Sequence, residues 1–230
     1  NGKRQKEAQY FETVIIGTGF SGLLATVRLQ KKNINDFVLL ERSSELGGTW
    51  QVNSYPGAEV DIPTSLYSIS FIPYPFKKTF SPQSELLEYT NYIIDKFNIR
   101  KFTKTDQSVT KLTYDEDEFL WHVETKSGES YIARFIIDTS GVQANPRTPY
   151  IEGAESFQGA AFHTAQWDHN VPHEGKRVGV IGSKADVRMA LIPLILLRNC
   201  DILQRSSINL LPARMRRSPC SDSDTSSRPP

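Results

Sequence analysis

The chain has 230 residues, of which 38% are hydrophobic and 23% charged, and its formal net charge at pH 7 is +1. That charge argues against nucleic acid as a partner, because nucleic-acid binders usually carry a concentrated basic face. The two cysteines, Cys200 and Cys220, are too few for a disulfide framework and indicate a reducing, cytoplasmic compartment. The longest apolar run, Met189 to Leu197, is too short to span a membrane, so no membrane partner is expected.

The first forty residues have the pattern of a dinucleotide-binding unit. A β-branched run at 12–16 leads into the glycine sequence 17–22, apolar residues at helical spacing follow over 23–32, and a second strand is expected at 37–40. An acidic residue, Glu41, comes nineteen positions after the last glycine. This order of strand, glycine loop, helix, strand and acid is typical of a βαβ unit that binds FAD or NAD.

Each residue type in that loop has a physical reason. Gly17 allows the tight turn, Gly19 lets a pyrophosphate approach the backbone, and Gly22 lets helix and strand pack closely. The helix N-terminus offers free N–H groups to the phosphates. Glu41 is expected to accept hydrogen bonds from an adenosine ribose and to repel a 2′-phosphate, which favours FAD or NAD over NADP. The other predicted FAD contacts at this end are Phe20, Ser21 and Arg42.

The middle of the chain predicts a loop, a helix and a meander. Residues 55–80 are rich in proline and aromatic rings that need burial, so an ordered loop packed on a ligand is expected. An amphipathic helix follows at 84–97, with Ser81 or Ser84 as its N-cap. Three strand-like segments joined by short polar turns then predict an antiparallel meander. These segments are 108–114, 119–125 and 130–137.

A second β-then-helix unit is predicted beyond the meander, with a strand at 176–181, a helix at 185–198 and a strand at 201–204. We therefore expect an α/β protein. Its fold would be a Rossmann-like, three-layer FAD-binding fold with a small antiparallel meander, followed by the start of a second, NADPH-type unit. The expected divisions are an FAD-binding domain at 1–145, a linker and partial NADPH-binding domain at 146–212, and a disordered tail at 213–230.

Two spaced motifs resemble those of Baeyer–Villiger monooxygenases. The first reads Gly-Gly-Thr-Trp at 47–50, Tyr-Pro-Gly at 55–57 and Asp61, and the second reads Phe157-x-Gly159-x-x-x-His163-x-x-x-Trp167. Related flavin-containing and N-hydroxylating monooxygenases share part of the second motif but usually lack its tryptophan. The resemblance runs from about residue 11 to 211 and covers well under half of a typical family member.

The resemblance implies roles for the first motif. Beside Gly48, Thr49 would lie along the flavin through a hydrogen bond and Trp50 through its indole face. Ordinary core packing is the alternative for Trp50. Asp61 would sit near the isoalloxazine and the nicotinamide, where it would hold an arginine that steadies the flavin peroxide. Its alternative role is to cap a loop.

The same resemblance reaches further residues. Tyr67 would contact the flavin, although a buried ring in an aromatic loop would look the same, and the backbone of Val109 would meet the adenine end. The second motif would form a hinge that couples NADPH binding to domain movement. His163 is more often a structural hydrogen-bonding residue than a proton carrier. No metal is expected, because the remaining histidines form no set with cysteine or acidic partners. These are His122, His169 and His173.

The second glycine loop departs from the family pattern G-x-G-x-x-G/S/A. It reads Gly182-Ser183-Lys184, so a long side chain stands where a glycine would admit the pyrophosphate, and Val187 replaces a small packing residue. Lys184 could offset this by pairing with a phosphate. Arg205 resembles the residue that holds the 2′-phosphate of NADPH, with a solvated surface arginine as the alternative. These four positions are the predicted NADPH contacts: Gly182, Ser183, Lys184 and Arg205.

The implied activity is FAD-dependent, NADPH-using monooxygenation of the Baeyer–Villiger type. One oxygen of O2 would be inserted next to a ketone carbonyl through a flavin C4a-peroxide, giving an ester or lactone. The family's active-site arginine lies downstream of this sequence, so we expect a truncated chain with weak or absent turnover. Two alternatives stay open: a chain that binds FAD without redox chemistry, and an N- or S-oxygenating flavin monooxygenase. The sequence does not indicate an oligomeric state.

Overall fold

The computed structural model describes residues 7–141, 146–173, 176–181 and 201–205 of the chain. Its larger sheet contains six strands in the order β3-β2-β1-β6-β5-β4. The bounds of these strands are β1 Gln9–Ile16, β2 Phe37–Leu40, β3 Thr103–Lys104, β4 Val109–Asp115, β5 Leu120–Thr125 and β6 Ser130–Asp138. The helices between them are α1 Phe20–Lys31, α2 Thr49–Val52, α3 Thr64–Tyr67, α4 Gln83–Lys96 and the 3-10 turn η1 Ile99–Phe102.

The parallel part of the sheet carries the predicted βαβ unit. Strand β1 pairs in parallel with β2, where Val14 faces Val38, and also with β6, where Val14 faces Ile136. Buried on both faces, β2 has only apolar residues and matches its predicted bounds. Helix α1 connects β1 to β2. It begins at Phe20, three residues before the predicted start, because its first turn lies within the glycine sequence 17–22.

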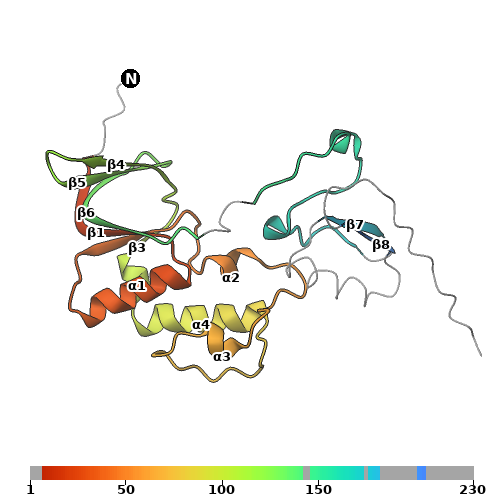
Figure 1. Cartoon of the computed structure of the whole chain (residues 1–230), viewed down its shortest axis with the longest axis horizontal. Coiled ribbons are helices and arrows are strands. Elements are labelled where there is room, and N and C mark those ends of the chain that lie inside the picture. The colour runs from red at the N-terminus through yellow and green to blue at the C-terminus, as the bar shows by residue number, and fades with distance from the viewer. Residues whose placement is uncertain (1–6, 142–145, 174–175, 182–200, 206–230) are drawn as a thin grey trace, which may run out of the picture.

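The predicted meander is present, but it is not a separate sheet. Strands β4, β5 and β6 pair antiparallel to one another, as expected. Strand β6 also pairs in parallel with β1, so the meander joins the main sheet through this shared strand. In Figure 1 the meander lies on one side of the parallel strands, and helices α1 and α4 lie on the other. These three layers confirm the expected Rossmann-like architecture.

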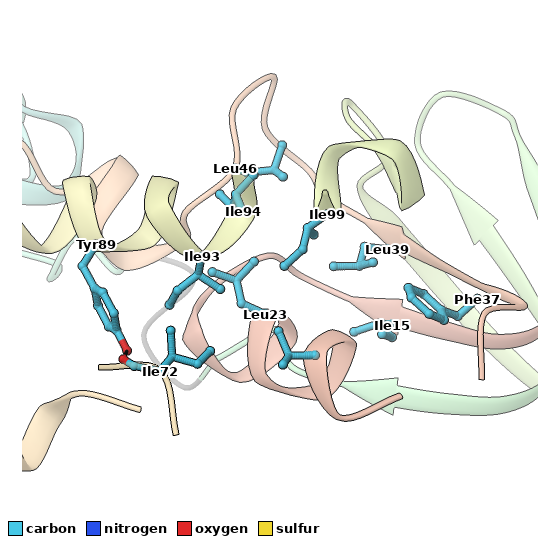
Figure 2. Packing of buried hydrophobic residues seen from close by; sticks show 11 residues of the cluster. Ile15, Leu23, Phe37, Leu39, Leu46, Ile72, Tyr89, Ile93, Ile94 and Ile99 are labelled. Carbon is cyan, nitrogen blue, oxygen red and sulfur yellow. Dashed lines mark hydrogen bonds between the residues drawn. The ribbon is translucent and has the colours of Figure 1, made fainter. Parts of the chain in front are cut away.

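Two apolar clusters hold the layers together. Between the sheet and the helices, Ile15 and Leu39 pack against Leu23 of α1 and Ile93 of α4 (Figure 2). On the opposite face of the sheet, the cluster joins the parallel strands to the meander. Its buried members are Val14, Val38, Leu40, Val123, Tyr131 and Ala133. Burial of this kind contributes roughly 1.5–3 kcal/mol for each large side chain.

The aromatic stretch at 55–80 is ordered, as predicted, and contains the short helix α3, which the sequence did not indicate. Its rings pack on the protein itself, since Tyr74 and Phe76 lie against Tyr89 of α4. The predicted N-cap of α4 is wrong. Pro82 occupies that position, and Ser81 instead donates a 2.7 Å hydrogen bond to the Glu85 carboxylate in the first turn.

The second unit is described only in part. Strands β7 Arg177–Ile181 and β8 Asp201–Arg205 pair in parallel, as the expected β-helix-β connection requires. Two short 3-10 turns, η2 Ala154–Ser156 and η3 Thr164–Gln166, precede them. The predicted helix at 185–198 and the predicted tail at 213–230 lie outside the described residues. None of the helices in the described ranges has the length and apolarity needed to cross a bilayer.

Candidate dinucleotide site

The first glycine loop turns sharply at the carboxyl end of β1. Gly17 has a φ of +97°, and a Cβ there would lie 2.9 Å from the carbonyl oxygen of Thr139. A Cβ at Gly22 would lie only 2.1 Å from the carbonyl oxygen of Gly17. Both positions therefore exclude any side chain: Gly17 lies at the tight turn, and Gly22 lets α1 pack closely on the end of β1.

Gly19 differs from these two glycines because the protein does not crowd it. The nearest atom to a Cβ built there is the Cα of Gly48, at an ordinary contact distance of 3.8 Å. Gly19 is also the N-cap of α1, and no side chain bonds to the helix start within the described chain. The first turn, which contains Phe20 and Ser21, thus presents backbone N–H groups beside an open glycine. This geometry fits a pyrophosphate.

The two glycine motifs of the first domain pack against each other. Gly48 has a φ of +58°, and a Cβ there would lie 2.6 Å from the Cα of Gly19. Gly47 donates its N–H to the Thr18 hydroxyl over 3.3 Å. The residues 47–61, which we call the motif loop, are therefore anchored directly to the phosphate-binding turn.

Glu41 lies at the carboxyl end of β2, beside that turn, and is 5% exposed. Its carboxylate accepts hydrogen bonds from the Thr18 N–H at 3.0 Å, from the Thr18 hydroxyl and from the Ser43 N–H at 2.9 Å. Glu41 thus ties the glycine loop to the residues after β2. Thr18 and Ser43 were not among the predicted residues, because their relation to Glu41 depends on the fold. The contact of Glu41 with a ribose stays a prediction.

An open hollow of about 460 Å³ lies next to this carboxylate. Its lining is polar and consists of Arg42, Ser43, Asp106, Ser108, Lys126 and Ser127. Val109 adjoins the hollow in sequence, but its side chain packs on the cluster beneath the meander. Arg42 lines this hollow together with Ser108, the residue before Val109, and the contact of Arg42 or of the Val109 backbone with an adenine stays a prediction.

Two predicted flavin contacts, Trp50 and Tyr67, form one aromatic group with Phe20, the first residue of α1. The Trp50 Nε1–H donates to the Tyr67 hydroxyl over 3.1 Å, and the two rings meet edge to face at 5.7 Å. Phe20 lies 5.3 Å from Tyr67 between ring centroids. Trp50 is 8% exposed and also packs on Val60 and Leu86, so core packing accounts for much of its surface. Its flavin contact stays a prediction.

Asp61 and Thr49 are both exposed and lie at the margin of this aromatic group. Burial raises the pKa of the Tyr67 hydroxyl, the bond from Trp50 lowers it, and the negative charge of Asp61 raises it further. Tyr67 is therefore a neutral phenol at pH 7. Because its oxygen accepts from Trp50, its own proton is available to a ligand.

A second hollow of about 390 Å³ runs along Phe20, Ser21 and Tyr67 towards Arg28.

The second motif reaches the first in space. Trp167 packs on Tyr55 and Ala58, and the Ser54 Oγ lies 2.8 Å from the His169 Nε2. His163 contributes locally, since its Nδ1 accepts the Ala165 N–H at the start of η3. This supports the structural role expected of His163. The contact of His169 with the motif loop was not predicted, because the two residues are 115 positions apart.

The expectation that His122 has no acidic partners is wrong. It lies 3.5 Å from Glu118, and Asp115 joins them in a cluster whose ligand atoms lie within 4.8 Å of one another. The antiparallel register of β4 and β5 brings the three residues together, because it pairs Asp115 with Leu120 at the end of the hairpin. The Asp115 carboxylate already accepts the N–H groups of Asp117 and Glu118, so its position is explained by the turn.

The predicted NADPH contacts fall mostly outside the structure. Gly182, Ser183 and Lys184, together with Val187, lie outside the described residues. Arg205 ends strand β8, and only its backbone is described. The parallel pairing of β7 with β8 nevertheless leaves the carboxyl end of β7 leading directly into the second glycine loop.

A crossover helix on a parallel sheet, a glycine turn with an open helix start and an acid after the second strand together define a dinucleotide-binding oxidoreductase fold. The chain belongs to the pyridine nucleotide-disulphide oxidoreductase family, whose match covers residues 14–187. Within that family its relatives include Baeyer–Villiger monooxygenases, which confirms the resemblance drawn from the two motifs.

Three similar proteins give the scale of the likeness. A Baeyer–Villiger monooxygenase of Streptomyces coelicolor is 38% identical over 81% of this chain and 36% of its own length. A phenazine N-monooxygenase of Lysobacter antibioticus is 30% identical over 90% of this chain and 39% of its own length. The solved structure of cyclohexanone monooxygenase from Rhodococcus sp. Phi1 bound to NADP+ superimposes with a TM-score of 0.79, at 32% identity, over 86% of this chain and 38% of that one. The chain thus spans less than two fifths of each relative.

Proposed function

We propose that the protein acts as an FAD-dependent, NADPH-using monooxygenase of the Baeyer–Villiger type, on a small-molecule ketone. The observation that carries this proposal is the joining of the two motifs in space. The glycine turn at Gly19, the motif loop and the segment around Trp167 form one connected site. The relatives that match most of this chain include proteins named Baeyer–Villiger monooxygenase and cyclohexanone 1,2-monooxygenase, which supports the proposal.

The residues of the chain have distinct roles in this proposal. The turn at Gly17, Gly19 and Gly22 would hold the pyrophosphate of FAD at the start of α1. Arg42 and the Val109 backbone would border the adenosine, and Glu41 would fix the turn while offering its carboxylate to the ribose. Trp50, Tyr67 and Phe20 would form an apolar wall that excludes water from the reacting ring. Gly48, Thr49 and Ser21 would border the same ligand.

Bound FAD would supply the redox chemistry, by accepting hydride from NADPH and activating O2. The overall reaction balances as ketone, O2, NADPH and a proton giving ester or lactone, NADP+ and water. Asp61 would hold a cationic group near the reacting ring, since its exposed carboxylate lies close enough to Tyr67 to affect that hydroxyl's pKa. NADPH would meet the second unit at Gly182, Ser183, Lys184 and Arg205.

Stopped-flow absorbance of the purified chain with FAD and NADPH tests the proposal. We expect a yellow flavoprotein whose absorbance near 450 nm bleaches when NADPH is added without O2. Failure to bind flavin would contradict the proposal at its centre. Bound flavin that NADPH never bleaches would favour the alternative of a non-redox FAD-binding protein.

The likeness to a phenazine N-monooxygenase favours N-oxygenation as a second candidate, because that relative covers 90% of this chain. Trp167 argues for the ketone reaction, as the resemblance implies. Product analysis after incubation with cyclohexanone or with phenazine separates the two. A lactone from cyclohexanone would support the first function, and an N-oxide with no lactone would support the second.

A further inference from the structure

The contact between Ser54 and His169 joins two parts of the chain that also meet where Trp167 packs on Tyr55 and Ala58. One part is the motif loop, and the other is the segment 157–173, which we call the strap. The Ser54 Oγ and the His169 Nε2 are 2.8 Å apart, and the ring tautomer decides which atom donates. Figure 1 shows the strap passing beside α2, the helix that precedes Ser54.

The local structure of the strap presents two side chains to the motif loop. The Asp168 carboxylate accepts hydrogen bonds from the Asn170 N–H at 2.9 Å and from the Asn170 side chain at 3.1 Å, which closes a tight turn around His169. On the other side, Trp167 is extended (φ −62°, ψ 125°). The turn at 168–170 follows directly on Trp167, so the two side chains come from adjacent parts of the strap. Trp167 then meets Tyr55 and Ala58 while His169 meets Ser54.

The motif loop is stiff enough to transmit this contact. Helix α2 ends at Val52, and the side chain of its C-cap residue Asn53, next to Ser54, donates to the Thr49 carbonyl oxygen over 2.9 Å. Beyond it, the Ala58 N–H donates to the Tyr55 carbonyl oxygen. Trp50 lies upstream of these turns, and its backbone oxygen accepts from Gln83 of α4. At the other end, β7 of the second unit begins at Arg177, four residues after the end of the strap.

We infer that Ser54 and His169 form a latch that seats the strap on the motif loop and so positions the second unit relative to the first. Neither residue belongs to the two family motifs, and neither touches the reacting atoms, so both are positioning residues. The seating of the strap is a property of the chain itself. Its consequence for hydride transfer rests on the proposed function.

Hydrogen exchange measured by mass spectrometry on the flavin-free chain tests the seating. We expect Ser54→Ala and His169→Ala each to speed exchange in peptides covering 163–171 by about fivefold, in line with the loss of one hydrogen bond. The double variant should exchange no faster than either single variant, because both remove the same bond. Ser54→Thr keeps a hydroxyl, and His169→Gln supplies a side-chain amide that can hydrogen-bond to Ser54, so both variants should retain slow exchange.

Two control variants guard against a general effect. Ser68→Ala removes a hydroxyl that bonds locally to the Ser65 carbonyl oxygen, and His122→Ala removes an exposed imidazole on the meander. Neither should change exchange in the strap. The latch is refuted if the alanine variants exchange like the wild type, or if the two single effects multiply in the double variant. If an alanine variant fails to fold, the Thr and Gln variants decide, since the latch requires slow exchange from both.

A second measurement addresses the consequence in flavin-loaded protein. Ser54→Ala should slow flavin reduction by NADPH about fivefold while leaving the dissociation constant for FAD unchanged, because Ser54 acts through the strap. An unchanged reduction rate would overturn the positioning role. A chain that binds no flavin would instead contradict the proposed function, and the exchange experiment would still decide the latch.

Discussion

Gly48 lies against Gly19, so closely that a Cβ on Gly48 would stand 2.6 Å from the Cα of Gly19. The two glycines belong to different motifs, one at the start of the motif loop and one in the phosphate-binding turn. Their contact explains why the motif loop begins with glycine, because both its φ of +58° and this approach exclude a side chain. Thr49 and Trp50, the predicted flavin contacts, are therefore placed by the glycine turn itself.

Replacing Gly48 with alanine is the direct test of this contact. The substitution should cost about 1–2 kcal/mol for the left-handed backbone, and more for displacing Gly19. We expect a lower melting temperature and weaker FAD binding, measured by thermal unfolding and by quenching of flavin fluorescence. Gly128→Ala is the matched control, since Gly128 has a φ of +84° but nothing within 4 Å of its Cβ. Equal losses in the two variants would show that backbone strain alone decides the cost.

Removing the Tyr67 hydroxyl should show how much its hydrogen bond from Trp50 contributes to the free energy of unfolding. In Tyr67→Phe the Trp50 indole N–H, held in a residue that is 8% exposed, loses its partner at 3.1 Å. A buried donor left without a partner costs about 1–3 kcal/mol, so the free energy of unfolding should fall by that amount. Chemical denaturation measures it. Tyr114→Phe, at an exposed position on β4, should have little effect, and an equal loss there would argue against the Trp50 bond as the cause.

The sequence predicted most of what depends on local spacing. The glycine turn, the apolar strand β2 and the meander follow from patterns within a few residues, so their bounds agree to within a few positions with the structure. Residues joined by the fold were harder to predict. Glu41 bonds to Thr18 across 23 positions, and Ser54 meets His169 across 115. Nothing in a serine or a histidine indicates such a partner before the chain is folded.

The same reason explains the errors. Serine is a favoured N-cap residue, but Pro82, one residue later, occupies the N-cap position of α4. The Ser81 hydroxyl donates to Glu85 instead. His122 has an acidic residue, Glu118, four positions before it, but beside a predicted strand this spacing does not indicate a contact, and Asp115 lies three positions further away. The hairpin register nevertheless brings Asp115 beside it. Local propensity could not predict either hydrogen-bonding partner. The start of α4 decides the partner of Ser81, and the pairing of β4 with β5 decides the neighbours of His122.

Glu41→Gln should loosen the turn between β1 and α1. The carboxylate accepts from two backbone N–H groups and one hydroxyl, whereas a glutamine would place an NH2 donor against at least one of them. We expect FAD affinity to fall at least tenfold in titrations followed by flavin fluorescence. Glu45 is exposed and lies four residues after Glu41, so Glu45→Gln should leave the affinity for FAD unchanged. Undiminished affinity in Glu41→Gln would contradict a role for the carboxylate in shaping the site.

Glu85 should make the stability of the helical layer depend on pH. The Ser81 hydroxyl and the Lys77 N–H lower the pKa of Glu85 below its ordinary value of 4.5, against the opposing effect of burial. A carboxyl whose pKa is lower in the folded than in the unfolded chain stabilises the fold above the unfolded pKa. That contribution is lost as the pH falls through the folded pKa. The urea midpoint should therefore fall between pH 5 and pH 3, and the fall should be shallower in Glu85→Gln. Glu116 is exposed in the β4–β5 turn, so the urea midpoint of Glu116→Gln should change with pH as that of the wild type does. If the midpoint of Glu85→Gln also changed as in the wild type, the Ser81–Glu85 bond would have no part in the acid sensitivity.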